Sequence, residues 1–318
     1  MKLLEVVDLR VSFETPYGQV RAVDGVSFEV DKREVVGLVG ESGSGKSTLG
    51  LSIIRLLPPN ARVLSGRVLF DGRELLSMPE RELRKIRGRE IAMIFQDPMT
   101  TLNPTMRAGE HIAEALVYHY GMSWEEAMKV AGEALEAVGI PAERAMDYPH
   151  QMSGGMRQRV MIAAALALKP KLIIADEPTS ALDVIVQNQI LDLLRKLRDE
   201  SGASVILITH DLSVTADLAD RVLIMYAGNI MEAGSVEQIY YGPLHPYTQG
   251  LLKSIPRLGH KGSLHLIPGQ PPDMTNPPPG CRFHPRCESA MPTCREEAPP
   301  AVEVEPGHLV ACWLYAKR

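Results

Sequence analysis

The chain has 318 residues, of which 45% are hydrophobic and 23% charged. These are ordinary values for a globular protein, and the length suits two units or one large unit with an appendage. The formal net charge of -5 gives no basic field for nucleic acid, and the longest apolar run, residues 160–168, is too short to span a bilayer. Because Glu5 interrupts the N-terminus before an apolar segment develops, we predict no signal peptide and a cytosolic or partner-tethered protein.

The first third of the chain is predicted to consist mainly of strands. Apolar and polar side chains alternate around Val11 and Phe13, which is typical of a half-buried strand. The expected elements are strands within residues 1–30, a strand over 34–39, a helix over 48–57, and strands over 67–70 and 91–95. Asp71 and Gly72 predict a hairpin turn after the fourth of these elements.

The pattern changes after Gln96, where residues 109–138 have the composition of a small helical insert. Alternation of helices and strands then resumes. The expected elements are a helix over 160–168, a strand over 171–175, a helix over 186–198, and strands over 204–209 and 222–226. Buried strands separated by helices predict a parallel sheet that is covered on both faces.

The segment beyond about residue 244 differs again in composition. Eleven of the 24 prolines fall between Pro268 and Pro306, and all four cysteines lie in the last 38 residues. Proline removes backbone donors and blocks regular elements, so the segment needs another source of order. The cysteines could supply that order. Because disulfides are improbable in a reducing cytosol, the four clustered thiols suggest a metal site more than a covalent staple.

A glycine-rich loop joins the predicted strand over 34–39 to the helix that follows. Its residues are Gly40, Glu41, Ser42, Gly43, Ser44, Gly45, Lys46, Ser47 and Thr48. The Gly-x-x-x-x-Gly-Lys-Ser pattern is that of a P-loop, whose backbone N–H groups surround phosphate oxygens next to the positive end of a helix. Lys46 is expected to reach the β- and γ-phosphates of ATP, and Ser47 to offer its hydroxyl to Mg²⁺.

Two acidic residues follow the predicted strand over 171–175. A P-loop site needs a carboxylate at the end of a neighbouring strand to hold Mg²⁺, and Asp176 fits that role. Glu177 is one residue further and is predicted to orient or deprotonate the attacking water.

A second anion-binding segment, Ser153-Gly154-Gly155, precedes the helix predicted over 160–168. With the P-loop before it and Asp176-Glu177 in Ile-Ile-Ala-Asp-Glu-Pro-Thr-Ser-Ala-Leu-Asp after it, this order resembles the nucleotide-binding subunits of ATP-binding cassette (ABC) transporters. The resemblance covers about residues 1–245. It implies an α/β fold: a P-loop NTPase (RecA-like) core, an antiparallel β subdomain, and a helical subdomain inserted at about 97–157.

The resemblance also assigns roles to single residues. It implies that two cassettes close head to tail, with ATP between the P-loop of one and Ser153, Gly154 and Gly155 of the other. Phe13 is expected to stack on adenine, with Tyr17 as a weaker candidate. The expected roles of the remaining residues are Mg²⁺ and water sensing for Gln96, an interface contact for Asp183, and a γ-phosphate contact for His210. Catalysis is thus expected to depend on Lys46, Gln96, Glu177 and His210.

The C-terminal region, residues 246–318, resembles the extension of oligopeptide and dipeptide importer ATPases, with Cys-Arg-Phe-His-Pro-Arg-Cys as its most specific segment. Its cysteines, spaced Cys-x5-Cys-x6-Cys-x17-Cys, are Cys281, Cys287, Cys294 and Cys312. The spacing lacks the Cys-x2-Cys pairs of common zinc sites and differs from ferredoxin spacings, so the spacing alone does not decide which metal is bound. The resemblance implies a 4Fe-4S cluster, with Zn²⁺ or free structural thiols as alternatives.

The function implied by this resemblance is ATP hydrolysis that energises import of dipeptides or oligopeptides. The expected partners are a second, homologous but different ATPase subunit, two transmembrane permease subunits and an extracytoplasmic solute-binding protein, with no nucleic acid. The expected location is the cytoplasmic face of the membrane. Close relatives carry oligosaccharides or nickel, so the identity of the solute is not decided. Nor is it decided whether the partner ATPase subunit is a different chain or a second copy of this one. A soluble ABC ATPase of DNA repair or translation would need a long coiled coil or two cassettes, and neither pattern is present.

Overall fold

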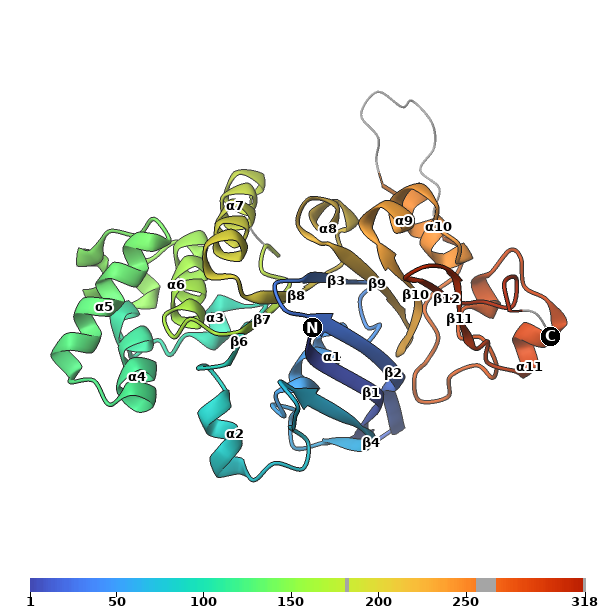
Figure 1. Cartoon of the computed structure of the whole chain (residues 1–318), viewed down its shortest axis with the longest axis horizontal. Coiled ribbons are helices and arrows are strands. Elements are labelled where there is room, and N and C mark those ends of the chain that lie inside the picture. Colours follow the sequence, from blue (N-terminus) through green and yellow to red (C-terminus); the bar gives the residue numbers. More distant parts are fainter. Residues whose placement is uncertain (181–182, 256–266, 317–318) are drawn as a thin grey trace. The chain divides into compact units, whose positions relative to one another are not determined.

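The computed structural model describes residues 1–180, 183–255 and 267–316, with the side chains of 197–201 left aside. The chain forms two compact units (Figure 1). The first comprises Met1–Val30, Val36–Leu76 and Thr209–Arg318, and the second comprises Asp31–Val35 and Ser77–Ile208. The predicted C-terminal extension, described here except for 256–266 and 317–318, therefore belongs to the same unit as the glycine-rich loop. A domain boundary at residue 245 stays a prediction.

The first unit begins with a four-stranded sheet in the order β2-β1-β4-β5. Its strands are β1 (Lys2–Thr15), β2 (Gly18–Asp31), β4 (Ala61–Phe70) and β5 (Arg73–Glu74). β4 pairs antiparallel with both β1 and β5, and Asp71 and Gly72 form the tight turn between β4 and β5 with positive φ values of 47° and 76°. The predicted strands and hairpin are confirmed, although β4 begins six residues earlier than expected.

A second sheet in this unit has the strand order β11-β12-β10-β9-β3. The strands are β3 (Val35–Val39), β9 (Arg221–Tyr226), β10 (Asn229–Ser235), β11 (Ala301–Glu305) and β12 (His308–Ala311). β3 and β9 are parallel, whereas β10, β12 and β11 continue the sheet with antiparallel pairs. The predicted parallel pairing is confirmed for β3 and β9. The antiparallel continuation was not foreseen, and it arises because β9 and β10 are joined by a short turn that only antiparallel strands allow.

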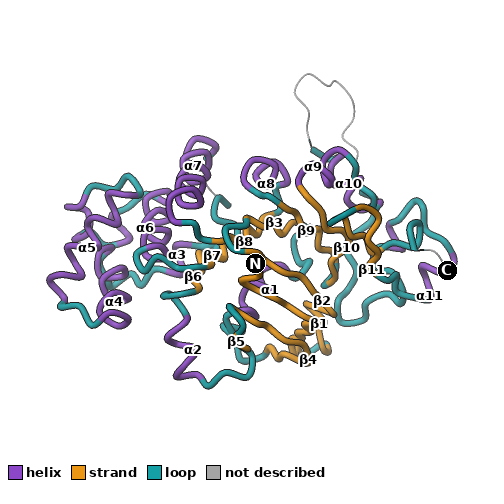
Figure 2. The backbone as a smooth tube through the Cα atoms, in the orientation of Figure 1, coloured by secondary structure: helices purple, strands orange, loops and turns teal. Residues whose placement is uncertain are grey.

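Helices complete the first unit, as the colouring by secondary structure in Figure 2 shows. They are α1 (Lys46–Ile53), α8 (Leu212–Leu218), α9 (Val236–Tyr241), α10 (Pro246–Lys253) and α11 (Pro292–Glu296), with a 3-10 turn η3 (His284–Arg286). α1 begins two residues before the predicted helix. It ends at Ile53, well before Pro58, because Arg55 adopts a left-handed conformation at φ 52°.

The second unit contains three parallel strands in the order β8-β7-β6. They are β6 (Ile91–Ile94), β7 (Leu172–Asp176) and β8 (Ser204–Thr209), and nearly all their residues are buried, as expected for strands of a parallel sheet. The predicted strands over 91–95, 171–175 and 204–209 are confirmed to within a residue.

The remainder of the second unit is helical. The helices are α2 (Glu80–Ile86), α3 (Pro98–Thr101), α4 (Ala108–Tyr120), α5 (Trp124–Ala137), α6 (Gly154–Leu166) and α7 (Val184–Ser201), with 3-10 turns at η1 (Ala142–Met146) and η2 (Pro149–Gln151). Ser123 caps α5 through a reciprocal bond with Glu126, and Gly121 ends α4 at φ 65°. The predicted helical insert is confirmed, whereas α2 was not foreseen.

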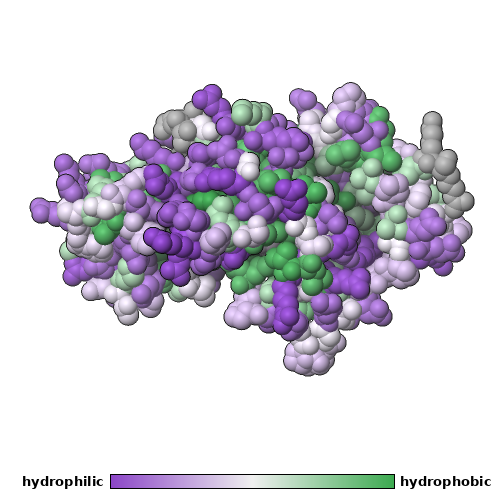
Figure 3. All heavy atoms as spheres, turned by 60° about the horizontal axis from the view of Figure 1, so that its bottom comes forward, coloured by the Kyte–Doolittle hydropathy of each residue, from purple (hydrophilic) through white to green (hydrophobic). Residues whose placement is uncertain are grey.

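No helix within residues 1–180, 183–255 and 267–316 has both the length and the apolar character required to cross a bilayer. Hydrophilic side chains are spread over the face displayed in Figure 3, with apolar residues between them.

Candidate functional site

The glycine-rich loop leaves the buried strand β3 and enters α1. Gly45 caps α1 with a φ of 102°, and a Cβ at this position would lie 2.0 Å from the carbonyl oxygen of Ala22. Both the left-handed backbone and the close approach therefore require glycine. Gly228 donates its N–H to the carbonyl of Ser44 at 2.9 Å, which fixes the loop from the β9–β10 turn.

Lys46 is folded back into this loop and is only 5% exposed. Its ammonium donates to the carbonyl oxygens of Gly40 at 2.8 Å and Glu41 at 2.9 Å, and lies 3.4 Å from the hydroxyl of Ser44. A buried cation surrounded by carbonyls at the positive end of a helix is suited to binding an anion in the space that the loop encircles. The predicted placement of Lys46 within a strand–loop–helix turn is confirmed.

Gln96, Asp176 and Glu177 lie close together in the second unit. Glu177 accepts hydrogen bonds on one carboxylate oxygen from Gln96 Nε2 at 3.1 Å and from Ser180 Oγ at 2.6 Å. Its backbone is left-handed, with a φ of 45°, and its N–H donates to Ile208 at 2.9 Å. Strain of this kind in a non-glycine residue is typical of functional positions. Asp176, 5% exposed, is the last residue of β7, so the predicted strand end with two acids is confirmed.

Ser153, Gly154 and Gly155 lie at the start of α6 in the same unit. Ser153 caps the helix by accepting the N–H of Met156 at 3.3 Å, and both Ser153 and Gly154 are exposed. A Cβ on Gly155 would lie 2.7 Å from a methyl group of Val186, so this glycine lets α6 approach the start of α7. Asp183 accepts the N–H of Val186 at 2.9 Å. The two predicted interface segments thus begin neighbouring helices.

Phe13, Tyr17 and His210 lie elsewhere in the first unit. Phe13 is half-buried on β1 opposite Ala61, whereas Tyr17 is 91% exposed in the turn before β2. His210 is exposed after β8. Their proposed contacts with adenine and the γ-phosphate stay predictions.

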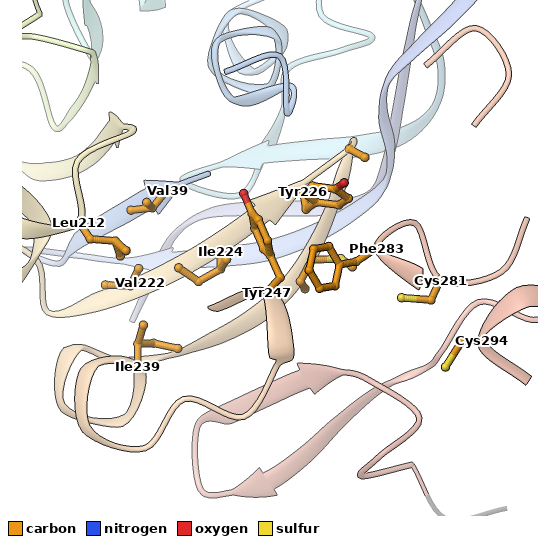
Figure 4. Packing of buried hydrophobic residues seen from close by; sticks show 12 residues of the cluster. Val39, Leu212, Val222, Ile224, Tyr226, Ile239, Tyr247, Cys281, Phe283 and Cys294 are labelled. Carbon is orange, nitrogen blue, oxygen red and sulfur yellow. The ribbon is translucent and has the colours of Figure 1, made fainter. Parts of the chain in front are cut away.

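The four cysteines lie in the C-terminal extension as free thiols. Cys281, Cys294 and Cys312 are each 8% exposed, and burial raises the pKa of Cys281 and of Cys312 to about 11. Cys281 and Cys294 belong to a cluster with Tyr226, Tyr247 and Phe283 (Figure 4). Neutral thiols in an apolar cluster behave as small hydrophobic side chains.

Comparison with known proteins finds two families in this chain. The family described as "ABC transporter" matches residues 23–180, and "Oligopeptide/dipeptide transporter, C-terminal region" matches residues 231–294. The oligopeptide transport ATP-binding protein OppD of Bacillus subtilis is 52% identical over 98% of this chain and 89% of its own length. The dipeptide transport ATP-binding protein DppD of the same organism is 51% identical over 100% of this chain and 96% of its own length. The chain belongs to the OppD/DppD family of ABC transporter ATP-binding proteins.

Solved structures agree with this membership. A dimeric post-hydrolysis state of the ATP-binding cassette MJ0796, bound to ADP and Pi, superposes with a TM-score of 0.67 at 32% identity. The match covers 73% of this chain and 98% of that cassette. This member of the family therefore has the ABC ATPase fold that the resemblance implied.

The expected 4Fe-4S cluster is wrong for this OppD/DppD-type chain. Within the described ranges, no group of three or more histidine, cysteine, aspartate or glutamate side chains is arranged to hold a metal ion. The thiolate is the form that binds metals, whereas burial of Cys281 and Cys312 favours the neutral thiol.

The extension is instead ordered by contacts with the rest of the first unit. β12 pairs with β10, and Phe283 lies with its ring centroid 5.3 Å from that of Tyr226 and 5.2 Å from that of Tyr247. Buried His308 contacts buried Glu232 at 2.8 Å. Sequence reasoning missed these contacts because they join residues far apart along the chain, and no local pattern indicates such pairs. Nothing in the spacing of Tyr247 or Arg286 indicates that they reach the glycine-rich loop.

Proposed function

We propose that this chain is the ATP-hydrolysing subunit of an importer for dipeptides or oligopeptides. The main support is the glycine-rich loop with buried Lys46, in a chain about half identical to OppD and DppD over nearly its whole length. These relatives are named for oligopeptide and dipeptide transport. We propose the cytoplasmic face of the membrane as its place. The proposed partners are a second, homologous ATPase subunit, two permease subunits and an extracytoplasmic solute-binding protein.

In the first unit, we propose that the loop amides and Lys46 bind the phosphates of ATP, and that the hydroxyl of Ser47 is a ligand of Mg²⁺. Phe13 is proposed to stack on adenine and His210 to contact the γ-phosphate. Lys46 fits the role because its ammonium already lies among loop oxygens, which phosphate oxygens can replace.

In the second unit, we propose Asp176 and Gln96 as Mg²⁺ ligands and Glu177 as the base for the attacking water. A hard cation suits their carboxylate and amide oxygens, and when bound it neutralises charge on the phosphates. Gln96 Nε2 and Ser180 Oγ hold the Glu177 carboxylate in one orientation, as a base that must address one water requires. Ser153, Gly154, Gly155 and Asp183 are proposed to contact ATP held by the partner ATPase subunit.

The test of the ATPase role is Glu177→Gln in the assembled transporter. The amide keeps the size of the side chain but cannot take a proton, so ATP binding should persist while turnover falls by about 100-fold or more. Glu305→Gln, which neutralises an exposed carboxylate on β11, should leave turnover unchanged. Hydrolysis by the Glu177 variant at the wild-type rate would show that another group is the base.

The solute is tested in vesicles that contain the permease subunits and this chain, with the solute-binding protein outside. ATP inside the vesicles should drive uptake of a labelled peptide. Uptake of nickel or an oligosaccharide without peptide uptake would replace the proposed solute and leave the ATPase role standing.

A further inference from the structure

Glu41, the second residue of the glycine-rich loop, has a hydrogen bond on each of its polar groups. Its carbonyl oxygen accepts from Lys46 Nζ at 2.9 Å and from the N–H of Ser44 at 3.2 Å. Its N–H donates to the hydroxyl of Tyr247 at 3.0 Å, and its carboxylate accepts from Arg286 at 2.7 and 3.0 Å. Two of these five hydrogen bonds come from within the loop. The other three come from the C-terminal region, more than 200 residues later in the chain.

Arg286 is well fixed before it reaches Glu41. It ends η3 and is 8% exposed, with Nε donating to the carbonyl of Pro268 at 2.8 Å. Its guanidinium lies 5.7 Å from the ring centroid of Tyr226 and donates to the Tyr226 hydroxyl at 3.2 Å. A bidentate pair between a fixed guanidinium and a carboxylate constrains direction as well as distance.

Tyr247 is equally constrained. It lies in α10 with no exposed surface. Its ring packs against that of Tyr226, with 4.6 Å between the two ring centroids (Figure 4). The imidazole of His245 caps α10 by accepting the N–H of Tyr247 at 3.0 Å. The Tyr247 hydroxyl is thus held at a defined place beside the loop, where it accepts a hydrogen bond from the N–H of Glu41.

We propose that Arg286 and Tyr247 are positioning residues of the nucleotide site, through which the C-terminal extension sets the shape of the phosphate-binding loop. The inference rests on the proposed function. Glu41 carries one of the carbonyls that Lys46 contacts, so a displacement of Glu41 moves the oxygen that orients the lysine. Small displacements in a preorganised site are costly because binding depends on exact direction. Loss of the Arg286 contact therefore weakens ATP binding.

The alternative is that the ion pair only attaches the extension to the rest of the unit. In that case, loss of Arg286 lowers the free energy of unfolding and leaves the affinity of the folded protein for nucleotide unchanged. Affinity measured on protein shown to be folded separates the two.

The experiment measures binding of a non-hydrolysable ATP analogue to the full-length chain by calorimetry, with thermal melting as the check on folding. Arg286→Ala should raise Kd about tenfold, the loss of one charge-assisted pair. Arg286→Lys should give an intermediate Kd, because a lysine cannot make the bidentate contact. Arg295→Ala removes the same charge from an exposed position of the extension and should leave Kd unchanged.

Two further variants test the route through Glu41. In an E41Q background, Arg286→Ala should have little additional effect on Kd, since the two changes remove one interaction. Tyr247→Phe keeps the buried ring and should raise Kd about threefold by removing the hydroxyl alone. It also preserves the test if Arg286→Ala fails to fold.

The outcomes are distinguishable. A wild-type chain that does not bind the analogue overturns the proposed function itself. Wild-type binding with unchanged Kd in folded Arg286→Lys and Tyr247→Phe overturns only this inference. An equal effect of Arg286→Ala with and without E41Q rules out the route through Glu41.

Discussion

The glycine-rich loop and the C-terminal extension both contain residues outside helices and strands, but they are ordered in different ways. The turn of the loop into α1 depends on its own residues: Gly45 permits the turn, and Lys46 bonds to carbonyls within six residues of itself. The extension is shaped by distant residues, because β12 pairs with β10 and Phe283 packs on Tyr226 and Tyr247. A segment too poor in apolar residues to build a core can thus be ordered by joining a neighbour's core.

This difference explains why a motif describes the loop well and the extension poorly. A local arrangement requires particular residues at fixed spacing. An arrangement through distant contacts requires only that a few side chains, such as Phe283 and Arg286, reach the right neighbours.

The largest expected effect is on the distant contacts of the extension. Phe283→Ala removes a ring that is 3% exposed and should lower the free energy of unfolding by about 3–5 kcal/mol. Denaturant unfolding measures it. The matched change Tyr17→Ala, at an aromatic residue that is 91% exposed, should stay within about 0.5 kcal/mol. Equal costs at both positions would show that the extension does not share the core.

A smaller effect is expected in the loop. Gly45→Ala combines the strain of a φ of 102° with a Cβ 2.0 Å from a backbone oxygen, and should cost about 2–3 kcal/mol in the same measurement. Gly43→Ala provides the control, because φ is 76° but a Cβ would meet nothing within 4 Å. It should cost about 1 kcal/mol from strain alone. If the two variants were equally stable, close packing of the loop would not be what requires Gly45.

The pH dependence tests His245, which lies where the extension begins. Burial lowers its pKa from 6.5 to about 4, and its Nε2 has no hydrogen-bond partner in the portion of the chain that is described. The unfolded chain therefore binds more protons between about pH 6.5 and 4. Stability is complete above that window and falls as the pH is lowered through it, by up to about 1.4 kcal/mol per pH unit.

His245→Asn should remove this contribution, since asparagine can cap α10 but cannot titrate. Two other titratable residues lie nearby: Glu232 accepts the backbone N–H of His245, and His308 contacts Glu232. Both are present in the wild type and in the variant, so they contribute equally to the two measurements. The free energy of unfolding is measured between pH 4 and 7 for the wild type and for His245→Asn. Above pH 6.5, the two plots of free energy against pH should have the same slope. Identical slopes below that pH would mean that His245 is not buried in its neutral form.

The smallest effect concerns the cysteines. Cys281→Ala removes one buried sulfur from an apolar cluster and should cost about 1 kcal/mol, with Cys287→Ala, at a half-buried position, costing less. A loss of several kcal/mol from both variants, accompanied by loss of a bound metal, would contradict the packing role.

Much of the fold could be predicted from local patterns. The buried runs of β6, β7 and β8 and the turn at Asp71 and Gly72 follow from rules that span a few residues. α6 begins six residues before the predicted helix, because Ser153 caps it there. The two glycines that follow have low helix propensity and hide this start from a local pattern, although Gly155 suits the first turn next to Val186. β11 and β12 were missed because β12 joins the sheet by pairing with β10, 76 to 78 residues earlier, and β11 in turn pairs with β12.

The sequence by itself determined the glycine-rich loop between β3 and α1, the acids after β7, the helical insert and the family, since each depends on residue types at short, fixed spacing. Only the tertiary structure decided how the C-terminal extension is ordered and that Arg286 and Tyr247 reach Glu41. These outcomes depend on burial and on contacts across more than 200 residues. No local pattern encodes which side chains will share a core.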